Sequence, residues 1–96
     1  MTAQFMTEGG TQEAEFLRLS YLLMKQGKNL RDVYPARLTR ILGGSGSRAT
    51  VYYLGANSFS DPRVLVEKLK TMFGNGTDAL LEGLIDRANE VLGGAQ

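Results

Sequence analysis

Four acidic residues recur at every fourth position near the end of the sequence, namely Asp78, Glu82, Asp86 and Glu90. In a helix, this spacing places the four carboxylates in one row along one face. Carboxylate oxygens on successive turns could bind Ca²⁺ or Mg²⁺ weakly, or could receive a basic partner surface. A solvated face is the simpler interpretation, because charged helical faces usually interact only with water. No loop has the ligand pattern of a strong calcium site, so no tightly bound cofactor is expected.

Basic residues gather earlier in the chain. Between residues 25 and 48, six of them stand against a single acid, Asp32, whereas residues 75–96 hold four acids and one Arg. The six are Lys25, Lys28, Arg31, Arg37, Arg40 and Arg48. They either pair with the acidic helix inside the folded domain or offer a surface to a partner. That partner would be another protein, a second copy of the chain, or nucleic acid.

Nucleic acid is the least favoured of these partners. A helix-turn-helix over residues 35–55 would place Arg48 at the start of its recognition helix, but the residues that follow belong to a core and not to a base-reading surface. Tyr52 and Tyr53 could stack on single-stranded bases, yet an aromatic pair in a short apolar helix is expected to be buried. The glycine-rich residues 43–48 lack the strand and the Lys of a P-loop, so they predict a flexible connector.

The sequence contains no His and no Cys. This excludes thiol nucleophiles, disulfides, imidazole bases and metal sites built from these residues. Catalysis by carboxylates alone needs burial to separate their pKa values, and the acidic row is expected to face water, so we expect no enzyme activity. No apolar run approaches the roughly 20 residues of a membrane span, and no signal peptide opens the sequence. We therefore expect a cytoplasmic protein without a membrane partner.

Length and apolar spacing predict one small all-α domain. The 96 residues suffice for a single core,. Residues 1–10 lack apolar periodicity and predict a flexible leader, which leaves residues 11–96 as the domain. Five segments follow, and their starts are marked by Thr11, Asn29, Ser47, Asp61 and the turn at residues 75–77. Short loops between helical segments predict a compact bundle of four to five short helices. The expected core is Leu19, Leu23, Leu38, Ile41, Leu54, Leu65, Leu69, Phe73, Leu81, Leu84 and Ile85.

Two places in this scheme are ambiguous. Proline disfavours helical geometry in the residue before it, so Pro35 predicts a short turn over residues 30–34 and a helix that begins at Pro35 and ends at Gly43. Residues 48–54 have strand propensity between two helix caps. A lone strand would have no partner for its backbone groups, so the context favours a helix there.

The second half of the sequence resembles a family of small archaeal helical domains that serve as output or regulatory domains. The resemblance rests on VYYLG at residues 51–55, DP at 61–62, KL at 68–69 and MFGNGT at 72–77. It implies a cytoplasmic, non-enzymatic regulatory or protein-interaction domain, and it supplies no active-site residues. This function is our leading expectation. Weak divalent-cation binding through the acidic row and nucleic-acid binding through residues 25–48 are the alternatives.

Overall fold

The computed structural model describes residues 8–93, with side chains from residue 12 onward. In this part of the chain the α-helices are α1 (Glu8–Lys25), α2 (Leu30–Ser58), α3 (Pro62–Phe73) and α4 (Thr77–Leu92), and a 3-10 helix, η2 (Gly74–Gly76), joins α3 to α4. Residues 8–93 contain no strand. The all-α prediction is confirmed, and residues 48–54 are helical as the context favoured.

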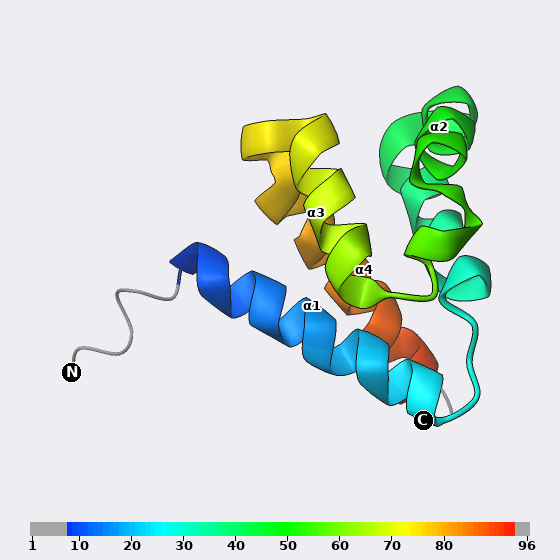
Figure 1. Cartoon of the computed structure of the whole chain (residues 1–96), viewed down its shortest axis with the longest axis vertical. Coiled ribbons are helices and arrows are strands. Elements are labelled where there is room, and N and C mark those ends of the chain that lie inside the picture. The colour runs from blue at the N-terminus through cyan, green and yellow to red at the C-terminus, as the bar shows by residue number, and fades with distance from the viewer. Residues whose placement is uncertain (1–7, 94–96) are drawn as a thin grey trace.

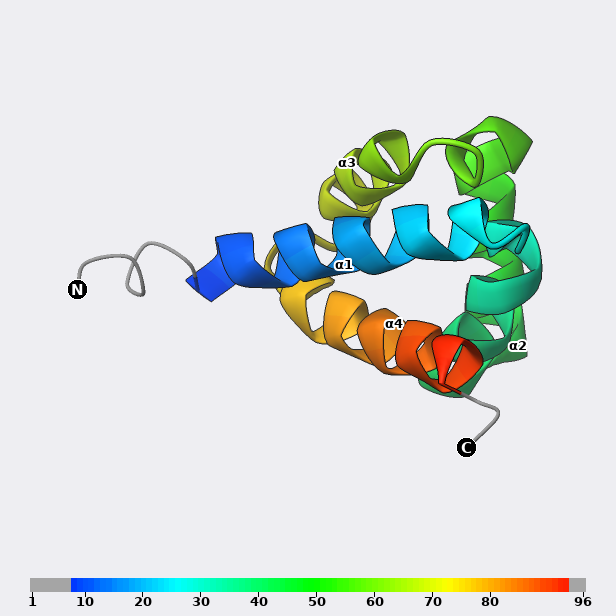
Figure 2. The same ribbon diagram turned by 90° about the horizontal axis from the view of Figure 1, so that it is seen from below.

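The helices α1, α3 and α4 form one group, and α2 stands outside this group. Figure 2 shows α1 and α4 lying side by side, with α3 on the other side of α1. The long helix α2 stands across one end of these three helices (Figure 1) and contacts each of them. Because α2 meets the other helices at an angle, only parts of its length are covered, and the rest faces outward.

The helix starts follow local rules for the most part. Asn29 Oδ1 accepts a hydrogen bond from the Arg31 amide at 3.0 Å, and Asp61 Oδ1 accepts one from the Arg63 amide at 3.1 Å. Such caps contribute about 1 kcal/mol each. The start of α1 was predicted wrongly, because the helix begins at Glu8 and Thr11 therefore lies inside it. The remainder of the predicted leader, residues 1–7, lies outside the described residues.

The turn predicted before Pro35 is wrong, because α2 begins at Leu30 and continues through the proline. Pro35 stands early in the helix, so it removes one intrahelical hydrogen bond, at a cost of about 3 kcal/mol or more. On both sides of the proline, α2 buries Leu30, Val33, Tyr34 and Leu38. Burial of each such side chain contributes roughly 1.5–3 kcal/mol, which outweighs the cost of the proline.

Two glycines bend α2 instead. Gly43 has φ 83° and ψ 169°, and Gly55 has φ 75° and ψ 164°. This region of backbone space is open essentially to glycine alone. The helix end predicted at Gly43 is a kink within α2, and the flexible connector predicted over residues 43–48 is wrong, because the chain is helical again from residue 44. The two glycines set residues 44–54 apart as a helical segment with its own direction, which we call the middle segment of α2.

The core contains eight of the eleven residues expected, and Phe73 and Ile85 pack at its edge. The prediction that Ile41 belongs to the core is wrong, because 44% of this residue is exposed. It lies just before the bend and approaches α4 at Gly83, where an added Cβ would come within 2.7 Å of Ile41 Cδ1. The centre of the core joins α1 to α2, because the rings of Phe16 and Tyr34 lie 5.1 Å apart.

Tyr34 places its hydroxyl in the same buried region. The hydroxyl oxygen lies 2.7 Å from Ser20 Oγ of α1. Burial raises the pKa of Tyr34 to about 12, and the hydrogen bond with Ser20 opposes this shift. A buried, paired hydroxyl fixes how α1 and α2 align, because any shift would leave a polar group without a partner.

Candidate interaction surfaces

The basic stretch and the acidic row meet at Glu90. Arg37 of α2 donates from Nη2 to Glu90 Oε2 of α4 at 2.6 Å, and from Nη1 to the Gly83 carbonyl at 3.0 Å. Only 11% of the Arg37 side chain is exposed, against 51% for Glu90. Arg37 thus joins α2 to α4. This contact agrees with the interpretation in which the basic stretch pairs with the acidic helix inside the folded domain.

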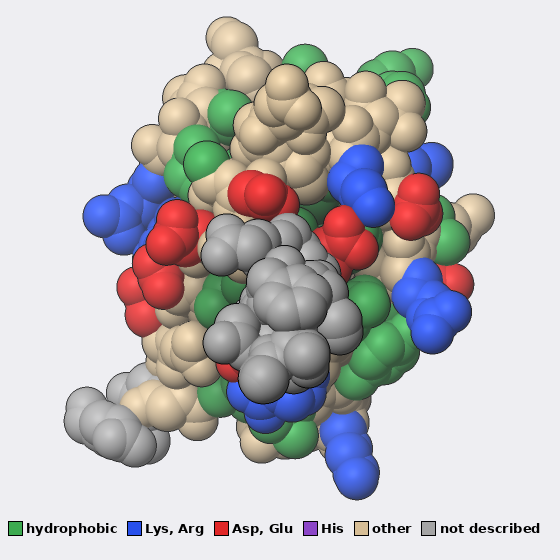
Figure 3. All heavy atoms as spheres, turned by 90° about the vertical axis from the view of Figure 1, so that its left-hand side faces the viewer, with side chains coloured by type: hydrophobic (Ala, Val, Ile, Leu, Met, Phe, Trp, Pro, Cys, Tyr) green, Lys and Arg blue, Asp and Glu red, His purple; other side chains and the backbone are tan. Residues whose placement is uncertain are grey.

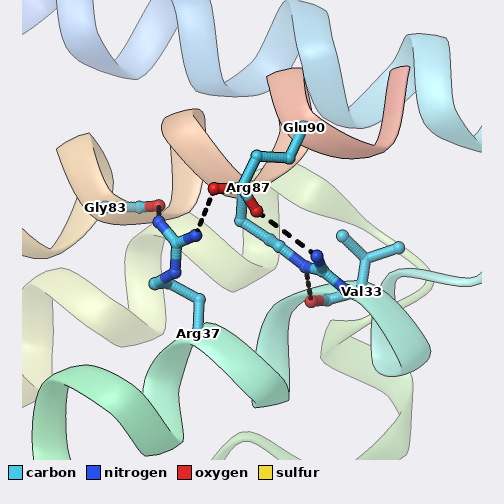
Figure 4. A network of polar contacts seen from close by, with 5 residues as sticks. All are labelled: Val33, Arg37, Gly83, Arg87 and Glu90. Carbon is cyan, nitrogen blue, oxygen red and sulfur yellow. Dashed lines mark hydrogen bonds and ion pairs between the residues drawn. The ribbon is translucent and has the colours of Figure 1, made fainter. Parts of the chain in front are cut away.

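Arg87 of α4 completes this network, which Figure 4 shows. Its Nε donates to the Val33 carbonyl of α2 at 3.1 Å, and its Nη1 lies 3.4 Å from Glu90 Oε1. We call Arg37, Arg87 and Glu90 with these two carbonyls the arginine clamp. The hydrogen bond from Arg37 is the main cause that holds the pKa of Glu90 below its usual value, and the charges of both arginines act in the same direction.

The other three members of the acidic row do not join Glu90. Asp78, Glu82 and Asp86 are exposed on α4. Among the described side chains, no three acidic groups come close enough together to hold a metal ion. The Cβ atoms of residues one turn apart are about 5–6 Å from each other, and a cation needs several oxygens around one point. The weak Ca²⁺ or Mg²⁺ site stays a prediction for which the fold gathers no ligand set.

The six basic residues divide among three places. Lys25, Lys28 and Arg31 are exposed around the turn between α1 and α2, whereas Arg48 is exposed on the middle segment of α2. The remaining pair, Arg37 and Arg40, faces α4. The basic stretch therefore does not form one continuous patch, because the turn at residues 26–29 and the bend at Gly43 separate its parts.

Two adjoining hollows lie between α2 and α4. The larger, open hollow measures about 570 Å³ and is lined by Arg37, Arg40, Ile41, Asp86 and Glu90. The smaller measures about 90 Å³, and Arg37, Arg40 and Glu90 also line it, together with Ala36 and Arg87. Two guanidinium groups, those of Arg37 and Arg87, thus contact the Glu90 carboxylate, and Arg40 lines both hollows without an ion pair to it. Within the described part of the chain, Arg37 Nε is also buried without a hydrogen-bond partner.

The most exposed large apolar side chains lie elsewhere, on the middle segment of α2. Tyr52 is 90% exposed and Tyr53 47%, so the expectation that this pair is buried is wrong. Small polar residues occupy the inner face of the segment in their place. Ser47 and Thr50 are buried there, and Thr50 Oγ1 donates to the Gly46 carbonyl at 2.8 Å. Because short side chains let the segment approach the rest of α2 closely, the tyrosines are left on the outside.

Lys68 of α3 extends the exposed tyrosines into a larger surface. Its Nζ lies 5.8 Å from the centre of the Tyr53 ring and donates to the Leu54 carbonyl at 3.2 Å. One turn before it, Val64 is 38% exposed, and the two line a shallow apolar hollow with Arg63, Glu67 and Thr71. We define the tyrosine surface as Arg48, Tyr52, Tyr53, Val64 and Lys68. The sequence marked Lys68 only as part of the family resemblance and did not mark Val64, because the role of both in this surface depends on α3 packing beside the middle segment.

The tyrosine surface carries two cations, Arg48 and Lys68. The stretch between Asp32 and Asp61 holds no acidic residue, and of its three arginines only Arg48 belongs to this surface, whereas Arg37 and Arg40 face α4. The face of the molecule in Figure 3 is different, because acidic and basic side chains lie next to one another there. One contact of that mixed kind is the ion pair between Glu13 of α1 and Lys70 of α3, at 2.9 Å.

Comparisons of the chain with models of protein families, with curated proteins and with solved structures found no significant match. Within residues 8–93, no helix has both the length and the apolar character that crossing a bilayer requires.

Proposed function

We propose that the protein is a non-enzymatic, cytoplasmic protein-interaction domain of the regulatory kind, and that its tyrosine surface binds an acidic, partly apolar segment of a partner protein. The exposure of Tyr52 and Tyr53 beside Lys68 is the observation that carries this proposal. Tyrosine is enriched at the centres of protein interfaces, because it offers a large apolar area and a polar tip at a low entropic cost. The absence of His and Cys supports a function without catalysis,.

The charge around the tyrosines supports an acidic partner. Arg48 stands one turn before Tyr52 on the same helix, and its guanidinium lies near Gly44, where an added Cβ would be 3.5 Å from Nη1, so this cation borders the tyrosines on their N-terminal side,. Lys68 provides a second cation on the adjacent helix, while Glu67 is the acid that borders the surface. A partner segment that alternates carboxylates with apolar residues would pair with both cations and cover the rings and Val64.

Single-stranded nucleic acid is the second candidate, and it is favoured by the same exposed rings. Bases stack on aromatic side chains, and each stacked base contributes about 1–3 kcal/mol. We place it second because the cations of the tyrosine surface are few, whereas nucleic-acid sites need a groove that follows the phosphate backbone.

The experiment is an NMR titration with three probes: a twelve-residue peptide that alternates Glu with Leu and Phe, the same peptide with Gln for Glu, and oligothymidylate. We expect saturable shifts at residues 48–54 and 63–71 with the acidic peptide only. Tyr52→Ser should weaken binding by about tenfold, the loss typical of an aromatic anchor. Tyr21→Ser is the matched control, because Tyr21 is 45% exposed on α1.

Three results would overturn the proposal. Equal binding of the acidic and the Gln peptide would remove the role of charge. Equal losses in the two tyrosine variants would place the site elsewhere. Saturable binding of oligothymidylate alone, with a steep dependence on salt, would replace the protein partner with single-stranded nucleic acid.

A further inference from the structure

The arginine clamp holds its two guanidinium groups in place without help from Glu90. Arg37 is fixed by the Gly83 carbonyl and by its burial, and Arg87 is fixed by the Val33 carbonyl. Each arginine then directs a further nitrogen to a different oxygen of Glu90, at 2.6 and 3.4 Å. The fold therefore presents two preorganised donors to one oxyanion (Figure 4),.

Glu90 is the weakly held member of this arrangement. Half of its side chain is exposed, and it stands in the last turn of α4, which ends at Leu92. The pair of Glu90 with Arg87 is long, at 3.4 Å, whereas the pair with the largely buried Arg37 is close, at 2.6 Å. A glutamate side chain can rotate outward without unfolding the helix, so another oxyanion that pairs with both arginines can take its place.

The surroundings of Glu90 suit a ligand of higher charge than a carboxylate. Arg40 lines both hollows that contain Glu90 and makes no ion pair with it, so a third cationic side chain borders the site. With Glu90 turned outward, three arginines face one acid, Asp86. Phosphate carries close to two negative charges near pH 7, and the guanidinium fork matches its oxygens. The exposed Ile41 gives the larger hollow an apolar wall beside these arginines.

We propose that this site binds a phosphate monoester, with the phosphoryl group replacing the Glu90 carboxylate between Arg37 and Arg87 and the organic group lying against Ile41. Glu90 then acts as an internal competitor that occupies the site until the ligand displaces it. The monoester belongs either to a small metabolite or to a phosphorylated side chain, since the two share this chemistry. The site is separate from the tyrosine surface and does not depend on the function proposed for it.

The test is an NMR titration of the full chain with phenyl phosphate at constant ionic strength, observing the Nε–H signals of the arginines. We expect saturable shifts of Arg37 and Arg87. Glu90→Gln should tighten binding by about tenfold, because it removes a like charge from the site. Arg40→Gln should weaken it by a similar factor. The matched controls are Glu82→Gln, an exposed acid two turns earlier on α4, and Arg31→Gln, an exposed arginine of α2; neither should change the affinity.

Further arms separate the ligand classes. Benzoate should bind more weakly than phenyl phosphate, and inorganic phosphate should lose the contribution of Ile41. Glycerol phosphate and a phosphotyrosine tripeptide then distinguish a metabolite from a modified side chain. Shifts that rise linearly at all surface arginines, or affinities unchanged in both Glu90→Gln and Arg40→Gln, would overturn the proposal. Because the Arg40 side chain is exposed, that variant still decides the matter if Glu90→Gln fails to fold.

Discussion

Arg37 and Arg87 each donate a hydrogen bond to a backbone carbonyl of the helix that carries the other arginine. Each also stands four residues after the carbonyl that its counterpart binds, since Arg37 follows Val33 and Arg87 follows Gly83 by one turn. The contact between α2 and α4 is therefore reciprocal, and Glu90 lies between its two halves. Gly83 faces α2 at this contact, because a Cβ added there would come within 2.7 Å of the Ile41 side-chain end and 3.9 Å of Arg37 Cγ.

Removal of Arg37 should destabilise the fold more than removal of any exposed arginine. Arg37→Ala deletes two hydrogen bonds from a largely buried side chain and leaves the Gly83 carbonyl without this partner. We expect a loss of about 2 kcal/mol in the free energy of unfolding. Arg31→Ala, at an exposed position of the same helix, should change it by less than about 0.5 kcal/mol. Urea unfolding of both variants measures the difference, and equal losses would refute the clamp's structural role.

Stability should fall as the pH is lowered through the acidic range. The pKa values of Glu90 and Glu15 are lowered in the folded protein, mainly by hydrogen bonds from Arg37 and Arg18. A carboxyl whose pKa is depressed on folding stabilises the protein above its unfolded value, and this contribution disappears as the pH falls through the folded value. Urea unfolding at several pH values below 6 should show this loss. The double variant Glu15→Gln, Glu90→Gln should show a weaker dependence, and an unchanged slope would contradict the assignment.

The buried pair of hydroxyls should be coupled. Tyr34→Phe or Ser20→Ala leaves the other hydroxyl buried without its partner, which should cost about 1–3 kcal/mol. The double variant should lose less than the sum, and a double-mutant cycle measures the coupling. If the two losses are simply additive, the hydrogen bond has no energetic role.

Tyr34 should also limit stability at high pH. Its pKa rises to about 12 in the folded state from an ordinary value of 10.0. A phenol that is kept neutral by folding contributes fully below the unfolded pKa, and its contribution is lost as the pH rises between these values. Tyr34→Phe should remove this part of the alkaline loss in unfolding experiments between pH 9 and 12. An identical alkaline profile in the variant would argue against burial of the hydroxyl.

Substitution by alanine should change the stability of the protein in opposite directions at the two neighbouring glycines, Gly43 and Gly44. Gly43→Ala forces a side chain into a region reserved for glycine, so we expect a loss of about 1–3 kcal/mol. Gly44 has no such backbone conformation, and an alanine Cβ there would meet only Arg48 Nη1 at an ordinary 3.5 Å. Gly44→Ala should therefore stabilise the helical segment by up to about 1 kcal/mol. Thermal unfolding compares the two, and stabilisation by both would show that Gly43 does not need its positive φ.

Local signals in the sequence were sufficient for the fold class and for most helix boundaries. Asn29 and Asp61 have side chains that cap a helix through bonds to residues two positions away, and Gly43 interrupts a helix wherever it adopts positive φ. The apolar period of 3.6 residues identified most of the core. Caps, glycine bends and apolar periodicity all depend on residues that are close together in the sequence, so they can be predicted without the tertiary structure.

The candidate sites were predicted only as sets of residues. Both Arg37 and Glu90 belonged to the charged groups expected to matter, but their contact joins residues 53 positions apart. Arg87 was visible as a cation among the acids of α4, whereas its bond to Val33 was not. Only the packing of α2 against α4 brings these groups together, because a hydrogen bond between distant segments requires both backbones to be in place.

The sequence by itself thus determined that the chain is helical, where most helices begin, and which chemistries its residues cannot perform. The tertiary structure decided which side of each helix is covered. Pro35 remains in a helix because the burial around it outweighs one lost hydrogen bond, while Ile41, Tyr52 and Tyr53 stay exposed because the bends of α2 turn them away from the core. Burial is a property of the assembled helices, so it follows from the balance of all their contacts and not from the residues nearby in sequence.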